Sequence, residues 1–381
     1  PEVKLLKAEI LLNEGKLDEA ETLLNSIEEE KSLETIIDVA YLYMDMGYPE
    51  KALPWLTLGL EEYKENEEFL AAMADCYRSG ERNTKAISFY NKLIDKNPYN
   101  PSYWTGLAKC HFSQQEFDKA VEACDFALAA DDKFGEAHII RAHSLFHLEN
   151  ETEAIQEYQL ALQSKSLPPD FAHMFIGLAY ANQEKWELAY RSYEQAMKII
   201  GDDNSPILSD IYSNEIFCLS KLGRYEEAHQ LCEKAKKQLP ESVEIYLQEG
   251  RLYLEEDKFE EAKQCWAVAL QYAPEAETLV QIGNYSLDYG MVENARLCFE
   301  EAKKQDPDYP GINGRLASIC MILRDHKGFQ KYNQMSETPL NIEMIQEMLS
   351  QNTDKDILQN LETFMNELDD VNDGETEEEN N

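Results

Sequence analysis

The sequence has 381 residues, and its 35 lysines and arginines stand against 74 aspartates and glutamates, a formal net charge of −39. An excess of acid this large, with no stripe of basic residues to offset it, argues against binding to nucleic acid or to an anionic membrane surface, because the phosphate groups of either would be repelled. No apolar run approaches the roughly 20 residues that a membrane-spanning helix needs.

A helical hairpin repeats along the chain from its first residues to about residue 335. Its clearest copy is residues 243–276. Tyr246, Gly250 and Tyr253 have the i, i+4, i+7 spacing of one helix face. A turn at Asp257 and Lys258 separates them from a second stripe, made of Phe259, Ala262, Trp266 and Ala269 and followed by Pro274. Two short amphipathic helices are therefore predicted in each copy.

Small residues mark the other copies. The marker of the second helix is Ala20, Ala52, Ala86, Ala120, Ala154, Ala189, Ala228, Ala262 and Ala295, with spacings of 32, 34, 34, 34, 35, 39, 34 and 33. The marker of the first helix lies twelve residues earlier, at Ala8, Ala40, Ala74, Ala108, Ala142, Gly177, Ile216, Gly250 and Gly283. Small residues let two helices cross closely. One hairpin cannot bury its own apolar faces, so the copies are expected to stack.

This period and pattern resemble the tetratricopeptide repeat. The resemblance covers roughly residues 1–335, with nine clear units and a weaker tenth around Ala317 and Phe329. It implies an all-α fold, a right-handed superhelical solenoid of about ten hairpins with C-terminal capping helices. Pro1 is not an initiator methionine, and the first unit begins where a preceding one would end. We therefore expect a fragment or processed form in which repeats or a signal peptide precede Pro1.

In chain order, the predicted organisation is six units in residues 1–200, a loop at 201–206, further units in 207–335, capping helices in 336–368 and a disordered acidic tail in 369–381. The turn-forming loop is either a tolerated insertion or a hinge that changes the superhelical pitch. The segment 354–368 either caps the array or is a free amphipathic helix. The tail has seven acids and no base, a composition typical of disorder.

No motif of a known catalytic class is present, and neither an enzyme activity nor a cofactor is predicted. The eight cysteines form no C-x-x-C pair and fall inside predicted helices, which favours buried free thiols in a reducing cytoplasm. His143 and His147 lie four residues apart and share a helix face. They leave open a metal-dependent protein as an alternative, although two imidazoles lack a third ligand.

A partner-binding groove is the stronger hypothesis. In stacked hairpins of this kind the first helices line the concave surface. The stripe that begins one residue after the marker should face that groove in the fifth to eighth units. It comprises Ile139, His143, Phe146, His147, Phe171, Met174, Leu178, Ser213, Asn214, Phe217, Leu247 and Arg251. Aromatic, methionine and polar side chains on a concave surface suit a bound peptide or helix. The alternative is burial between adjacent units, for Phe146 and Leu178 especially.

Some proteins with this repeat grip a C-terminal carboxylate with lysine and asparagine on one first helix and with asparagine, lysine and arginine on the next two. Here no first helix carries the lysine–asparagine pair, and only Asn214, Arg251 and Arg315 are scattered candidates. The predicted function is a non-enzymatic scaffold that binds a protein or peptide in the concave groove, with Phe171, Met174 and Phe217 as apolar anchors. A self-associating, homodimeric structural protein is the second hypothesis. The partner and the pathway are not encoded in the sequence pattern.

Overall fold

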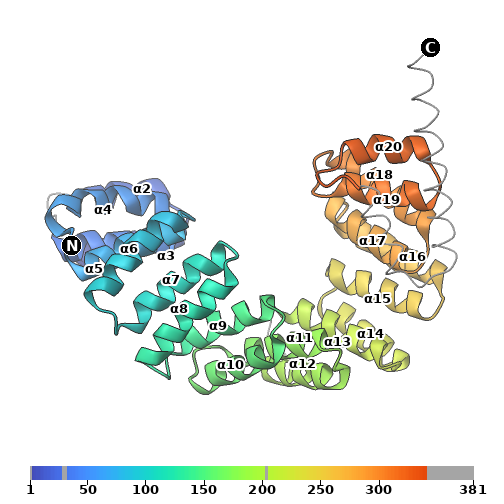
Figure 1. Ribbon diagram of the computed structural model, residues 1–381, viewed down its shortest axis with the longest axis horizontal. Helices are drawn as coiled ribbons and strands as arrows, with labels where there is room; N and C mark the ends of the chain where they lie inside the picture. Colours follow the sequence, from blue (N-terminus) through green and yellow to red (C-terminus); the bar gives the residue numbers. More distant parts are fainter. Residues whose placement is uncertain (1, 28–31, 202–204, 341–381) are drawn as a thin grey trace, which may run out of the picture. The chain divides into compact units, whose positions relative to one another are not determined.

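The computed structural model describes residues 2–27, 32–201 and 205–340, and within these ranges the chain forms twenty α-helices joined by short turns (Figure 1). The helices are paired as antiparallel hairpins, so the predicted all-α repeat architecture is confirmed. The chain divides into two compact units, Pro1–Ser205 and Pro206–Asn381, and each is considered by itself.

The first unit contains six hairpins. Their helices are α1 (Glu2–Asn13), α2 (Leu17–Asn25), α3 (Leu33–Asp45), α4 (Pro49–Tyr63), α5 (Glu67–Ser79), α6 (Asn83–Lys96), α7 (Pro101–Ser113), α8 (Phe117–Ala130), α9 (Gly135–His147), α10 (Glu151–Gln163), α11 (Pro169–Asn182) and α12 (Trp186–Ile200).

The described part of the second unit contains four hairpins, and the weak tenth repeat is the last of them. Their helices are α13 (Leu208–Lys221), α14 (Tyr225–Gln238), α15 (Val243–Glu255), α16 (Phe259–Tyr272), α17 (Ala276–Asp288), α18 (Val292–Gln305), α19 (Ile312–Ile322) and α20 (His326–Gln334).

Aromatic rings pack against the small markers where two helices of a hairpin cross. A Cβ atom added to Gly250 would come within 2.2 Å of the Trp266 indole nitrogen, and one added to Gly283 would meet Phe299 at 2.4 Å. The exception in the marker series, Ile216, is compensated in size: the second helix of that hairpin carries the small Cys232 where the others carry Trp266 and Phe299. Close packing thus conserves volume rather than residue type.

The turns inside the hairpins require a left-handed residue. Gly15, Gly47, Gly223 and Gly290 have φ between +71° and +80°, as their predicted turn positions imply. Other hairpins place a non-glycine residue there, such as Glu81 with φ of 57°. Left-handed backbone disfavours residues with a Cβ, which explains why glycine recurs at this point.

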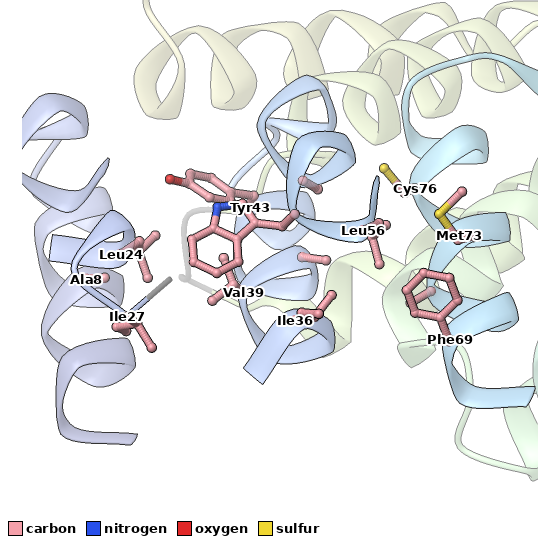
Figure 2. Packing of buried hydrophobic residues seen from close by; sticks show 14 of the residues in the cluster. Ala8, Leu24, Ile27, Ile36, Val39, Tyr43, Leu56, Phe69, Met73 and Cys76 are labelled. Carbon is pink, nitrogen blue, oxygen red and sulfur yellow. The ribbon is translucent and has the colours of Figure 1, made fainter. Parts of the chain in front are cut away.

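Apolar clusters join neighbouring hairpins within a unit. In the first three hairpins one cluster joins Leu24 of α2, Val39 of α3, Leu56 of α4 and Met73 of α5, all at most 2% exposed (Figure 2). In the described residues each of these clusters extends across adjacent hairpins, so hairpins depend on their neighbours for burial.

Successive odd-numbered helices lie against each other inside a unit. Such contacts join α3 to α5, α5 to α7, α7 to α9 and α13 to α15, whereas successive even-numbered helices make no comparable contacts within the described residues. Helices on the inside of a curve are closer together than those on the outside. Within each unit the odd-numbered, first helices therefore form the inner layer. We call the side of these helices that faces away from the second helices the first-helix face.

Two parts of the predicted organisation stay predictions. The predicted loop at 201–206, either an insertion or a hinge, falls at the junction of the two units, where Gly201 has φ of +62° and residues 202–204 lie outside the described ranges. The predicted capping helices, apart from residues 336–340, lie outside the described ranges. The acidic tail at 369–381 lies outside them as well.

Candidate partner-binding surfaces

The predicted groove residues divide between the two units. Ile139, His143, Phe146 and His147 are on α9, and Phe171, Met174 and Leu178 are on α11, in the first unit. Ser213, Asn214 and Phe217 are on α13, and Leu247 and Arg251 are on α15, in the second. They therefore belong to two surfaces, one in each unit.

A cluster of aromatic and histidine rings lies at α7, α8, α9 and α11 of the first unit. His147 is exposed and stacks on Phe117, with ring centroids 4.5 Å apart and ring planes 7° apart. Phe112 contacts both His147 and Phe117, at 5.6 and 5.5 Å between centroids. Phe146 meets the His147 ring edge-on at 6.1 Å. We call Phe112, Phe117, Phe146 and His147 the ring cluster; it offers flat apolar faces with a polar edge.

His143 is held by the protein itself. Its Nδ1 is 2.7 Å from the Tyr158 hydroxyl, and its ring lies edge-on to Phe175 at 4.7 Å. Burial, with a smaller contribution from His147, lowers the pKa of His143 to about 4, so the imidazole is neutral at pH 7. Within the described ranges no three His, Cys, Asp or Glu side chains are placed to hold a metal ion. The histidine pair therefore lacks the third ligand that the metal alternative requires.

In the second unit, Arg251 lies between two aromatic rings. Its guanidinium carbon is 4.1 Å from the centroid of Phe217 on α13 and 5.4 Å from that of Tyr285 on α17. Lys221, at the end of α13, pairs instead with Glu255 at 2.8 Å. The Tyr289 hydroxyl donates to the same carboxylate at 2.5 Å. Three successive first helices are thus joined through cation–π and charged contacts.

Three predicted groove residues are buried, contrary to the expectation. Leu247 is 1% exposed and packs in the cluster around Trp266, and Met174 is 7% exposed. Both lie three residues before a marker, Gly250 or Gly177, where the neighbouring hairpin covers the helix. Ser213 is also buried, and its hydroxyl donates to Glu244. None of the three is available as an anchor for a partner.

The remaining predicted residues are at least partly accessible. Ile139, Phe146 and Phe171 are half-buried and pack on the core of the fifth and sixth hairpins. Leu178 and Asn214 are half-buried as well, and the Asn214 amide donates to the Asp210 carbonyl at 2.7 Å. For Phe146 and Leu178 the structure combines the two alternatives, since each side chain is part core and part surface.

Four aromatic residues that contact the predicted groove residues were not included in the prediction: Phe112, Phe117, Phe175 and Tyr285. Phe112 follows the marker Ala108 by four residues, the same offset as Phe146 from Ala142. Extending the stripe to the fourth unit would have found it. Phe117 and Tyr285 lie outside that register, and only the packing of neighbouring hairpins brings them to the surface.

The cysteines carry no sign of a reactive thiol. Cys265 and Cys298 are half-buried and the other six are buried. Burial raises the pKa of all eight thiols, to about 12 for Cys124. They pack as small apolar groups, as the sequence predicts. In the described part of the chain, none of the helices has the length and apolar character to span a membrane.

Three family models match parts of the chain. Two are described as tetratricopeptide repeat, over residues 172–207 and 219–281. The third is described as anaphase-promoting complex, cyclosome, subunit 3, over residues 79–161.

Relatives match at low identity. Anaphase-promoting complex subunit 7 of Dictyostelium discoideum is 23% identical over 64% of this chain and 41% of its own length. The human DnaJ homolog subfamily C member 7 is 22% identical over 67% of this chain and 56% of its own length. The chain thus spans about half the length of these relatives.

Among solved structures, a tetratricopeptide repeat protein from Parabacteroides merdae matches with a TM-score of 0.50 and 15% identity, over 76% of this chain and 98% of the other. That likeness concerns the fold alone. The marker series, the twenty paired helices of the described ranges and the matching repeat models agree: the chain belongs to the tetratricopeptide repeat family.

Proposed function

We propose that this chain is a non-enzymatic scaffold that binds a segment of another protein on its first-helix face. Tetratricopeptide repeat proteins bind protein partners. One matching family model and one relative are named as subunits of the anaphase-promoting complex. The ring cluster carries the proposal, because it groups the exposed His147 with Phe112 and Phe146 of the first helices α7 and α9, beside Phe117 at the start of α8. The eight free thiols support a reducing, cytoplasmic location.

Aromatic residues dominate the energetics of protein interfaces, and a few of them carry most of the affinity. Phe171 of α11 is half-buried and Phe217 of α13 is half-buried, so each can contribute an exposed ring face. His147 adds a polar edge to an apolar surface, which suits a peptide with both kinds of group.

Replacing His147 and Phe171 by alanine should weaken partner binding about tenfold or more, because each truncation removes accessible aromatic area from the first-helix face. The measurement is affinity capture from the source cells with the full chain, then titration of the purified captured protein. Leu188→Ala is the matched control, because Leu188 is 42% exposed but lies on α12, a second helix. The proposal fails if the control and the double variant bind the captured protein equally well. Unchanged helicity in circular dichroism separates lost binding from lost folding.

A second candidate function is self-association through α1, favoured by one observation. Val3, Leu6 and Ile10 are 81%, 60% and 52% exposed. The equivalent residues of the third hairpin, Phe69, Ala72 and Cys76, are at most 3% exposed because the preceding hairpin covers them. An apolar helix face of this kind is typical of a surface that another helix covers.

If a second copy covers this face, Leu6→Glu combined with Ile10→Glu should convert a dimer to a monomer, since two carboxylates cannot be buried unpaired. Light scattering of both proteins at several concentrations makes the measurement, and Leu188→Glu is the control. A monomeric wild-type protein at all concentrations would count against this candidate and leave the scaffold proposal unaffected.

A further inference from the structure

The ring cluster has no cation of the chain over its rings, whereas several other aromatic rings of the fold do. In the third hairpin the Lys92 ammonium lies 5.0 Å from the centroid of the Phe89 ring, and in the eighth Lys258 lies 5.8 Å from that of Tyr253. Within the described ranges, no lysine or arginine lies over a ring of the ring cluster. Because the face of an aromatic ring is negative, the accessible faces of this cluster can take a cation from another molecule.

Two exposed carboxylates lie beside the ring cluster. Asp118 directly follows Phe117 at the start of α8. Glu149 lies two residues after His147, in the turn between α9 and α10. Neither carboxylate has an ion pair or a side-chain hydrogen bond with another described residue. A carboxylate next to an aromatic ring adds to the attraction of that ring for a cation, so both features select a positively charged ligand.

The basic residues of the surrounding helices cannot neutralise these two carboxylates. Each lysine or arginine of α7–α10 is already paired with a carboxylate of the chain. The pairs are Lys109 with Glu136, Lys119 with Glu116, and Arg141 with Asp125 and Glu157. Negative charge therefore remains beside the rings, at a place where the fold supplies no cation of its own.

The neighbouring first helices α3 and α5 extend this negative charge within the same unit. Their only basic residue, Arg78, pairs with Asp75 at 3.3 Å. Their other acids are all exposed: Glu34, Asp38, Asp45, Glu67 and Glu68. A surface of one sign attracts a segment of the opposite sign, raises its association rate and repels a segment of the same sign. An acidic ligand is thus disfavoured on this layer of helices, and a basic one is favoured.

From these observations we propose that the ring cluster binds a basic amphipathic segment of the partner protein. This inference rests on the proposed function and adds the chemistry of the ligand. Apolar side chains of the segment would contact Phe112 and Phe146, and an arginine or lysine would lie over the rings with its charge directed to Asp118 or Glu149. Arginine suits this place best, because a guanidinium both stacks on aromatic faces and pairs with carboxylates.

The probe is a fluorescein-labelled peptide of alternating arginine and leucine, and the uncharged comparison is the same peptide with citrulline in place of arginine. Fluorescence anisotropy with the full chain at physiological ionic strength measures both affinities. The arginine peptide should bind at least about tenfold more tightly, because the citrulline peptide lacks the cation–π and charge-assisted contacts. Asp118→Asn combined with Glu149→Gln should weaken binding of the arginine peptide about tenfold and change that of the citrulline peptide less than about twofold.

A second double variant separates a local site from attraction by the whole acidic chain. Glu261→Gln combined with Glu293→Gln removes the same charge from exposed residues near the starts of α16 and α18, in the second unit. It should change the affinity for the arginine peptide less than about twofold, because salt screens charges that lie far from the site. Equal losses for the two double variants, or equal affinities for the two peptides, would overturn the proposal.

His147→Ala should weaken binding of both peptides, since its ring contact does not depend on the charge of the ligand. If the Asp118 and Glu149 double variant loses helicity, Glu149→Gln alone decides, because Glu149 lies in a turn. Capture of a partner that depends on His147 and Phe171, together with failure of the arginine peptide, would refute the basic ligand and leave the scaffold function standing. Binding of the arginine peptide through Asp118 and Glu149, with no captured protein that depends on His147 and Phe171, would uphold the ligand chemistry and count against the scaffold.

Discussion

Trp266→Ala should lower the free energy of unfolding of the second unit by about 3–5 kcal/mol, the usual cost of removing a buried aromatic side chain. Trp266 is 2% exposed and fills the space over Gly250 where α15 and α16 cross. Its indole nitrogen donates to the Leu247 carbonyl at 3.4 Å, so the substitution also leaves a buried acceptor with one partner fewer. Urea denaturation of the full chain, followed by circular dichroism, measures the effect.

Phe259→Ala is the matched control, because Phe259 belongs to the same helix but is 38% exposed. Its cost should be below about 1 kcal/mol. Gly250→Ala tests the same contact from the other side, since the added methyl group would displace the indole ring. Equal midpoints for Trp266→Ala and Phe259→Ala would show that the crossing of these helices does not depend on the ring.

The sequence pattern predicts the fold well because the repeat is set by local volume. A small residue such as Gly250 and a large one such as Trp266 occur at fixed spacing, and the same contact recurs between Gly283 and Phe299. The larger marker Ile216 fits the same volume rule, because its hairpin has the small Cys232 at the position equivalent to Trp266. A spacing of small residues that recurs nine times leaves little room for another architecture.

The groove is predicted less well, for a physical reason. Exposure of Leu247 or Met174 depends on how closely the next hairpin approaches, and the pattern of a single helix carries no information on that distance. The polar partners are also non-local: Tyr158 orients His143 from the second helix, and Tyr285 reaches Arg251 from the next hairpin. Helical spacing identifies which residues share a face, but neighbouring hairpins decide which of them remain accessible.

The second large effect on stability is expected at a buried charged network in the fifth hairpin. Glu157 of α10 is 9% exposed, and one of its carboxylate oxygens lies 2.6 Å from Nδ1 of His138, which is 6% exposed. The other accepts from the Arg141 guanidinium at 2.8 Å. Glu157→Gln should lower the free energy of unfolding of the first unit by about 3 kcal/mol, because it removes the buried negative charge that pairs with Arg141 and places a neutral amide beside the imidazole.

An exposed ion pair of the same unit is the control. Glu187 and Arg191 lie one turn apart on α12 with their side chains 49% and 66% exposed, so Glu187→Gln should cost less than about 0.5 kcal/mol. Urea denaturation at pH 7 compares the two variants with the wild-type protein. A loss for Glu157→Gln as small as that for Glu187→Gln would mean that Asp125, 2.7 Å from Arg141 Nε, satisfies the arginine alone. A larger loss would show that α9 and α10 are held together by this network, which then positions His143 and His147 on the surface of the same hairpin.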